Sequence, residues 1–555
     1  MADIKEEQKT IAKGAFWSIF GTVTIKGISF IYTIILAHLM TQNQIGDFYL
    51  AVSVLGLLTI FTNIGIGKSF SRYLPYFYGK EQFKELKVLL KFGIFIAPVL
   101  PLIASILVFF GAELLSGFFD NPNLIPLLKI MSAYIFLDAL FKLGNAVLTG
   151  RKRIDYVRTS TIIQDFSKLI LTLILFYLIG VNTETLAYAF VLSFVFGAIY
   201  SLFRAYYEVK KINFGNIIES RKDYVNIARE IVPFGLIISV ITSMWMLISY
   251  SDRLMLGYLL PEGIASVQVG IYSIALGLGK LTLVFPTALG VIFFPVISEL
   301  FGRGDKEKME KTTETTVKWV LLITVPISLL IILFSNNFLD LFYGSDYEAG
   351  ATVLILFTVG FLIRSIGTIP GYVLATLRRL DIELKITLLT AIINVAINFL
   401  LIPIYGMNGA AFASFFSFLI FTILLVHYSK KLADFKFPLD SYKPLVAGIL
   451  AFGLLLLFKP YLWPILTDTV SNIQIGAGKG GTFEEILQKV IKLAIFGILF
   501  IVTSFVYFVI LLGLKAFGKD EIDILDAALR KGRIPEKYRG HIKKILEAEY
   551  IPKIM

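Results

Sequence analysis

The stretch VLTGRKRIDYVRTSTIIQDFSKLILTLILFYLIGVN, at Val147–Asn182, is followed later in this chain by a similar stretch of equal length. Its second copy, VLATLRRLDIELKITLLTAIINVAINFLLIPIYGMN, lies 226 positions later, at Val373–Asn408. Each copy reads as the end of an apolar helix, a short basic turn, and a second long apolar helix that closes on Gly-x-Asn. Repeats of apolar helices are typical of transporters, whose two similar halves enclose a central site. The chain is therefore predicted to consist of two related halves.

Further matches extend the repeat. IGDFYLAVSVLGLL at Ile45 and VGIYSIALGLGKLT at Val269 lie 224 positions apart, and the same offset relates FFGAELLSGFF at Phe109 to LFSNNFLDLFY at Leu333. The two halves then run in parallel orientation, with two helices appended. The predicted organisation is an N-terminal lobe of six helices (1–210), a C-terminal lobe of six helices (211–430), two further helices (431–515) and a cytoplasmic tail (516–555).

The composition indicates a membrane protein. Of 555 residues, 57% are hydrophobic and only 17% are charged, and a soluble protein has no way to bury so much apolar surface. The chain has no cysteine, which excludes a disulfide framework, a thiolate metal site and a cysteine nucleophile. The fold class is therefore an all-α membrane protein of about 14 transmembrane helices, given the ~20 residues that each crossing needs. The predicted spans are 14–38, 44–66, 88–110, 125–149, 157–180, 185–207, 230–251, 267–294, 316–334, 350–376, 384–403, 408–428, 443–458 and 489–513.

The positive charges predict the orientation. With both termini in the cytoplasm, 41 of the 52 lysines and arginines fall in inner segments and five, Arg253 among them, in outer ones. This asymmetry is typical of proteins that follow the positive-inside rule. We therefore expect a multi-pass protein of the cell (plasma) membrane. The rule also accounts for the net charge of +12 without any binding of nucleic acid.

Two of the acidic residues inside predicted spans, Asp138 and Asp165, each have a lysine within one turn of the same helix. Asp138 and Lys142 are four residues apart, and Asp165 and Lys168 are three residues apart, so each pair shares one face of a helix. The lysines can simply neutralise the carboxylates along their own helices. The alternative is that Asp138 and Asp165 carry a coupling ion, a proton or sodium, during transport.

Three other intramembrane cations, Lys26, Lys280 and Arg364, have no acidic residue within one turn of their own helix. A basic residue at the bilayer centre costs about 2.5–3.5 kcal/mol on insertion scales, so each should face a cavity or a partner. Arg364 is the repeat equivalent of Asp138, because their numbers differ by 226. With Lys142, these three cations are the candidate substrate-binding residues.

Polar and proline residues inside the spans suggest further functional positions. Asn394 and Asn398, four residues apart, can either hold helices together or bind a ligand. Pro98 and Pro101 are expected to kink the third span, and Pro286 interrupts the eighth.

The segment SYSDRLMLGYLLPEGIASVQVGIYSIALGLGKLTLVFPTALGVIFFPVISELFGRGD, at Ser249–Asp305, resembles the opening of the second half of polysaccharide-transporter family flippases. These belong to the multidrug/oligosaccharidyl-lipid/polysaccharide exporter superfamily. The residues that carry the resemblance are Asp252-Arg253 followed by Leu256-Gly257, Gly270-Ile-Tyr272, and Phe294-Pro295 before a basic loop; the first half offers the matching Gly46-Asp-Phe-Tyr49.

The resemblance implies a fourteen-helix flippase with two six-helix lobes. Such proteins carry undecaprenyl- or dolichol-linked oligosaccharides from the cytoplasmic to the outer leaflet by alternating access. They use no cofactor, and a proton or sodium gradient usually drives them. The implied partners are the lipid-linked oligosaccharide and membrane lipids. A monomer is expected, with polysaccharide-assembly enzymes as its candidate neighbours.

Two alternatives remain, one within the same superfamily and one of another functional class. A cation-coupled small-molecule or multidrug exporter of the same superfamily would need an acidic, aromatic pocket, whereas the lone charges in these spans are cationic. A membrane glycosyltransferase or ligase would need acidic residues on a substantial outer loop. The longest predicted outer loop offers only Asp468, Glu484 and Glu485, with no Asp-x-Asp. The sequence therefore favours a transporter over an enzyme.

Overall fold

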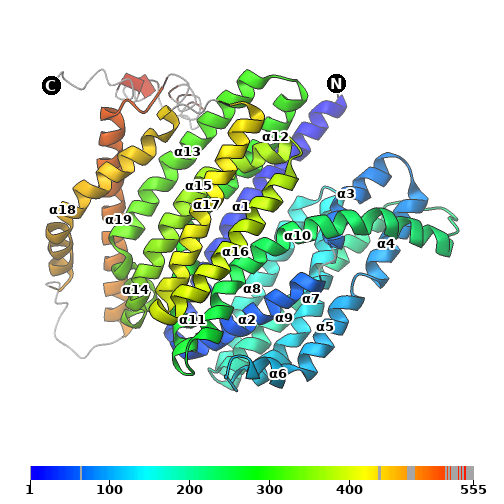
Figure 1. The fold of residues 1–555 in the computed structure, drawn as a ribbon, viewed down its shortest axis with the longest axis horizontal. Helices are drawn as coiled ribbons and strands as arrows, with labels where there is room; N and C mark the ends of the chain where they lie inside the picture. Colours follow the sequence, from blue (N-terminus) through cyan, green and yellow to red (C-terminus); the bar gives the residue numbers. More distant parts are fainter. Residues whose placement is uncertain are drawn as a thin grey trace. The chain divides into compact units, whose positions relative to one another are not determined.

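The computed structural model describes residues 2–62, 65–435, 439–471 and 482–518, together with isolated residues beyond 518. Most of the predicted cytoplasmic tail lies outside the described residues. In these ranges the regular structure is helical (Figure 1). The helices are α1 (Ala2–Leu39), α2 (Gln42–Thr62), α3 (Ile66–Gly79), α4 (Phe83–Phe95), α5 (Val99–Phe110), α6 (Ala112–Gly117), α7 (Leu124–Gly150), α8 (Ile154–Ile179), α9 (Thr183–Lys210), α10 (Arg221–Leu259), α11 (Ile264–Gly279), η1 (Lys280–Leu283), α12 (Val284–Gly302), α13 (Lys306–Leu333), α14 (Ser335–Tyr343), η2 (Ser345–Gly350), α15 (Ala351–Thr376), α16 (Leu380–Tyr405), α17 (Met407–Ala433), η3 (Leu439–Tyr442), α18 (Lys443–Ser471) and α19 (Thr482–Gly513).

The all-α membrane fold is confirmed. Thirteen segments of the described ranges are long and apolar enough to cross a bilayer, and each overlaps one of the fourteen predicted spans. The remaining predicted span, 230–251, lies inside the 39-residue helix α10. The third span is divided into α4 and α5 at the turn that ends on Pro98, as expected of a residue that lacks a backbone N–H.

The repeat is visible in the backbone. Lys152 and Arg378, 226 positions apart, occupy the left-handed region with φ of 57° and 59°, which is uncommon for residues other than glycine. In both turns the next residue donates its N–H to the carbonyl five positions earlier, at 2.9 and 3.0 Å, the bond that closes a Schellman motif. Gly180 and Gly406, with φ of 113° and 56°, close the two copies. Asn182 then caps α9 by accepting from the backbone N–H three residues later.

The chain forms two compact units. The first comprises residues 1–284 and 380–421, and the second comprises 285–379 and 422–555. In the first unit, α7 contacts α3, α5 and α9, while α2 contacts α10 and α11. One of its hydrophobic clusters includes Phe70, Leu74, Leu89, Leu148 and Ile231. These units group the helices differently from the predicted six-helix lobes, and the lobes remain a prediction.

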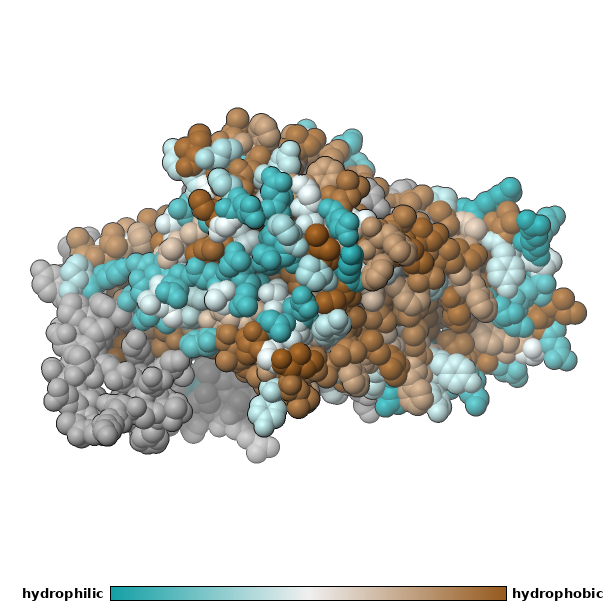
Figure 2. Space-filling model, turned by 90° about the horizontal axis from the view of Figure 1, so that it is seen from below, coloured by the Kyte–Doolittle hydropathy of each residue, from teal (hydrophilic) through white to brown (hydrophobic). Residues whose placement is uncertain are grey.

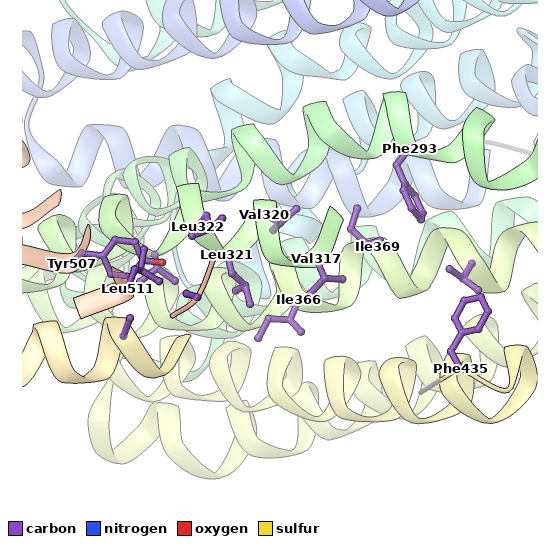
Figure 3. Close-up of a cluster of buried hydrophobic side chains, with 14 of the residues drawn as sticks. Phe293, Val317, Val320, Leu321, Leu322, Ile366, Ile369, Phe435, Tyr507 and Leu511 are labelled. Atoms are coloured by element: carbon purple, nitrogen blue, oxygen red, sulfur yellow. The ribbon is translucent and has the colours of Figure 1, made fainter. Parts of the chain in front are cut away.

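The second unit is built around α13, which contacts α15, α18 and α19. Figure 3 shows one of its hydrophobic clusters, in which Val317 and Leu321 of α13 point toward Ile366 of α15. The cluster also receives Tyr507 and Leu511 from α19. Helices α18 and α19 correspond to the two predicted C-terminal helices. Because both contact α13, they are part of this unit.

Large apolar side chains also cover much of the surface. Phe110, Tyr177 and Ile404 are 79%, 89% and 70% exposed, and Figure 2 shows hydrophobic side chains gathered right of centre on one face, between hydrophilic ones at the centre left and at the right-hand end. Soluble monomers rarely expose continuous apolar patches of more than a few hundred Å². These side chains are therefore the lipid-facing surface of a multi-span membrane protein.

Three lysines of α4 form ion pairs with the segment that links α9 to α10 and with the first turn of α10. Lys87 and Lys91 lie 3.1 and 2.9 Å from the carboxylate of Glu219, and Lys84 lies 3.0 Å from Asp223. Burial alone would raise the pKa of Glu219, but hydrogen bonds from a tyrosine and from the two lysines outweigh it and lower this pKa to about 2. The connection is therefore held by charge at every pH well above that value.

Candidate substrate cavity

A cavity of about 240 Å³ lies in the first unit, between α1, α2, α8, α9, α10, α11 and η1. Its lining includes four basic residues, Lys26, Lys168, Arg253 and Lys280. Two of the predicted substrate-binding residues, Lys26 and Lys280, are thus brought to one place from helices far apart in the sequence. The arrangement offers positive charge to a ligand from several sides.

The position of Lys280 follows from a break in the eighth predicted span. After α11 the chain forms the short 3₁₀ turn η1, which begins at Lys280. Pro286 has no N–H to give to the carbonyl of Thr282, so a regular α-helix cannot run through this point without losing that bond. The proline thus favours the turn that carries Lys280 into the cavity lining.

Arg253 has the most unusual surroundings of the four cations. Its side chain is 6% exposed and lies over the rings of Tyr49 and Tyr250, 5.6 Å from each centroid. One terminal nitrogen approaches the carbonyl of Ser249 at 3.4 Å, and Nε has no hydrogen-bond partner in the described structure. A buried cation without an anion costs several kcal/mol. Arg253 is therefore poised to bind an anion.

The helix that carries Arg253 is longer than its predicted span, and the position of this residue relative to the membrane stays a prediction. The hydropathy boundary at 251 assigns this residue to an outer segment, but α10 continues to Leu259 and buries the arginine. Helix α10 thus contains the predicted span 230–251 and extends beyond it at both ends.

The remaining cations differ in their partners. Lys168 forms an ion pair with Asp165 at 2.7 Å and lies 4.8 Å from the ring centroid of Tyr32. Lys26 forms no ion pair with any residue that the structure describes. The buried hydroxyl of Ser273, which also lines the cavity, has no partner in the described ranges. Among the described residues that line this cavity, four are basic and none is acidic, so the lining suits a negatively charged ligand.

The other predicted site residues lie elsewhere. Asp138 and Lys142 form the ion pair expected along their helix, at 2.5 Å, and line a second cavity of about 340 Å³ in the first unit. Arg364 lies on α15, in the second unit. The roles of Lys142 and Arg364 in substrate binding, and of Asp138 and Asp165 in ion coupling, stay predictions.

A buried polar network surrounds Asp252, which is 3% exposed. One carboxylate oxygen accepts from the amides of Asn398 at 2.6 Å and Asn394 at 3.3 Å, and the other accepts from the hydroxyls of Tyr272 and Ser414. The side-chain oxygen of Asn398 has no partner among the described residues. A buried carboxylate beside an unsatisfied oxygen, with neutral groups around it, matches what a proton or a small cation would need.

Comparison with known families identifies the chain. The model described as "Polysaccharide biosynthesis protein" matches residues 11–301, more than half of the sequence. The chain belongs to this family. A second model, MatE, matches residues 236–400. Both matches agree with the family and superfamily that the Ser249–Asp305 segment resembles, and so that resemblance is confirmed.

Relatives of this polysaccharide biosynthesis family member include named flippases. The probable low-salt glycan biosynthesis flippase Agl15 of Haloferax volcanii is 23% identical over 444 residues, covering 80% of this chain and 88% of the relative. The lipopolysaccharide biosynthesis protein WzxC of Escherichia coli is 24% identical, covering 72% and 75%. The fold matches lipid II flippase MurJ in its inward closed conformation, with a TM-score of 0.61, 16% identity, and 87% and 97% of the chains covered. The predicted class, a membrane transporter and not an enzyme, is confirmed by this family and these relatives.

Sequence reasoning missed several residues that this family member gathers in its cavities. Lys168 was treated only as the partner of Asp165, and the side chains of Tyr49 and Tyr250 were not considered. Asp252 carried the family resemblance but was not recognised as the centre of a polar network. The sequence showed that Asn394 and Asn398 share a helical face, but only the structure shows that both contact Asp252, 142 and 146 positions earlier.

Proposed function

We propose that this protein is a flippase for a lipid-linked oligosaccharide with a polyprenyl phosphate or pyrophosphate carrier. It would move this lipid from the inner to the outer leaflet for the assembly of a cell-surface polysaccharide or glycan. The observation that carries the proposal is the cationic cavity around buried Arg253. The names of the related flippases support the same substrate class.

The chemistry of the cavity suits the hardest part of such a substrate. A phosphate group cannot cross hydrocarbon unaided, because losing its hydration costs far more than membrane packing returns. Arg253, Lys26 and Lys280 can replace that hydration with charge-assisted hydrogen bonds. The lipid tails stay in the bilayer throughout, and alternating opening toward the two leaflets moves the headgroup. Arg364 of α15 is proposed as a further substrate-binding residue.

Energy coupling is a separate part of the proposal. The two sequence-based candidates, Asp138 and Asp165, are already neutralised by lysines at 2.5 and 2.7 Å. Asp252 has no ion-pair partner among the described residues and is surrounded by hydroxyls and amides. We therefore add Asp252, with Asn394 and Asn398, as the preferred site for a proton or sodium ion that drives transport.

The cellular setting completes the proposal. The charge asymmetry of the sequence supports a plasma-membrane protein with both termini in the cytoplasm. The cavity lies within one chain, in agreement with function as a monomer beside polysaccharide-assembly enzymes.

A cation-coupled multidrug exporter is the main rival. The MatE match supports a common superfamily, but a cavity lined by four basic residues would repel cationic drugs. The two functions therefore predict opposite substrate charges.

Transport in liposomes tests the proposal. The full chain would be reconstituted with a fluorescent polyprenyl-pyrophosphoryl-N-acetylglucosamine, and its movement between leaflets followed by quenching with dithionite. We expect the protein to accelerate movement of this anion and to leave the cationic dye ethidium unmoved. Transport of ethidium without movement of the anionic lipid would favour the exporter and contradict the flippase.

A further inference from the structure

The second cavity of the first unit has polar lining that the phosphate site does not use. It measures about 340 Å³ and lies between α2, α3, α5 and α7. Besides the Asp138–Lys142 ion pair, its polar side chains are Thr59, Thr62, Ser71, Asn145 and Thr149. Apolar residues of α5 and α7 make up much of the remaining wall.

The four hydroxyl groups share one hydrogen-bonding pattern. Thr59, Thr62, Ser71 and Thr149 each donate to a carbonyl of their own helix, at 2.7, 3.2, 3.0 and 2.7 Å. A hydroxyl has one proton to give and two lone pairs to receive. With the protons used, what these groups can still offer a ligand is acceptor oxygen. Such a lining matches a ligand that is rich in hydroxyl donors.

The same cavity also holds a few donors. The side-chain oxygen of Asn145 accepts from the hydroxyl of Ser160 at 2.6 Å, which leaves the amide N–H groups of Asn145 to donate. The side chain of Lys142 is 43% exposed while that of its partner Asp138 is 8% exposed, so the ammonium is the accessible end of the pair. Several acceptors with an amide and an ammonium donor fit a sugar that carries an acetamido or acidic group.

Helix α2 connects this cavity to the cationic one. Val52 lines the cationic cavity and Thr59 lines the second. Seven residues separate them, so both lie on one face of α2, about 10 Å apart along the helix axis. This is about the length of two sugar rings.

Tyr250 packs on α2 between Val52, which lines the cationic cavity, and Thr59, which lines the second cavity. Its ring covers Gly56 of α2, where an added Cβ would come within 2.4 Å of the ring, so only glycine allows this contact. The same ring is 5.6 Å from the guanidinium of Arg253, on the cationic side. An aromatic face at this point suits the apolar face of a sugar ring.

We propose that the second cavity is a sugar subsite, which receives the first sugars of the substrate while Arg253 and its neighbours hold the phosphate. The inference rests on the proposed flippase function and assigns the headgroup of that same substrate. Tyr250 separates the two subsites and stacks on the sugar nearest the phosphate.

Two probes that differ only in the sugar test the subsite. They are geranylgeranyl pyrophosphate and geranylgeranyl-pyrophosphoryl-N-acetylglucosamine, titrated into the purified full chain. We expect the sugar to increase affinity, and the double variant Thr59→Val/Thr149→Val to remove about tenfold of that increase, because each lost hydrogen bond weakens binding several-fold. Thr24→Val is the matched control, since Thr24 also donates to its own helix but lines neither cavity.

The outcomes separate this inference from the proposed function. An unchanged ratio of the two affinities in the double variant would overturn the sugar subsite while leaving the phosphate site standing. Failure of the sugar-bearing probe alone to bind the unaltered protein would overturn the sugar subsite, and failure of both probes would overturn the phosphate site as well.

A second measurement covers a variant that does not fold. The chain contains no cysteine, so Thr149→Cys provides a single thiol in the second cavity. We expect the sugar-bearing probe to slow its alkylation by a maleimide several-fold more than geranylgeranyl pyrophosphate does. Equal protection by both probes would count against the subsite.

Discussion

Replacing Arg253 by methionine should separate function from stability. Methionine has a similar length and no charge, so it removes the buried guanidinium while filling much of the same space. The cationic cavity then loses the side chain that lies over Tyr49 and Tyr250. We expect weaker binding of a pyrophosphate and greater stability of the empty protein in the same variant.

The size of both effects follows from the surroundings of Arg253. A hydrogen bond to a charged group contributes about 1.5–3 kcal/mol, so losing one bond to phosphate should weaken binding about ten- to hundredfold. In the empty protein the arginine is 6% exposed and forms no ion pair in the described ranges. Replacing buried ionic groups by apolar side chains is often stabilising by about 1–4 kcal/mol. The melting temperature should therefore rise as affinity falls.

The assay combines titration with geranylgeranyl pyrophosphate and thermal unfolding of the detergent-solubilised chain. Arg253→Lys keeps the charge but not the two-pronged geometry, and it should fall between the parent and methionine in affinity. Arg303→Met is the control, because Arg303 is exposed and paired with Glu299, and it should leave binding unchanged. A lower melting temperature with intact binding in Arg253→Met would refute the reasoning and make Arg253 a structural residue.

Three other predictions concern topology, coupling and pH. Single cysteines in Arg153→Cys and Arg379→Cys should resist an impermeant maleimide added from outside intact cells, and labelling of either would reverse the predicted orientation. Asp252→Asn should keep binding of the pyrophosphate probe but lose the dependence of transport on an ion gradient; gradient-driven transport in this variant would place coupling elsewhere. A fluorophore on Ile218→Cys, a position 87% exposed, should gain mobility as pH falls from 4 toward the pKa of Glu219 of about 2, because a lowered pKa stabilises only above it. In a Glu219→Gln background the probe should be mobile at pH 7 already, and equal anisotropy in both backgrounds would contradict the ion-pair model.

The helices could be predicted from the sequence because a bilayer imposes one simple requirement. Each crossing needs a long apolar run with its backbone bonds satisfied internally, and thirteen such segments coincide with predicted ones. The two repeated turns could also be predicted from the sequence. Lys152 and Arg378 share an uncommon backbone conformation in the structure, in agreement with the repeat. The sequence could not predict which helices pack together, because lipid-facing and protein-facing apolar surfaces have the same composition.

Of the four basic residues that line the cationic cavity, only Lys26 and Lys280 could be selected from the sequence as substrate-binding residues. A lone charge in an apolar run is conspicuous, which is why Lys26 and Lys280 could be selected, and both line the cationic cavity. Arg253 escaped because hydropathy locates the end of an apolar run, whereas hydrogen bonds locate the end of the helix, and α10 continues beyond the run to Leu259. A hydropathy scale assigns little free-energy cost to a cation just beyond the end of an apolar run. Arg253 occupies such a position, yet its side chain is buried between two tyrosines. The cations that matter most in such a protein are therefore to be sought in the last two turns of each span as well as at its centre.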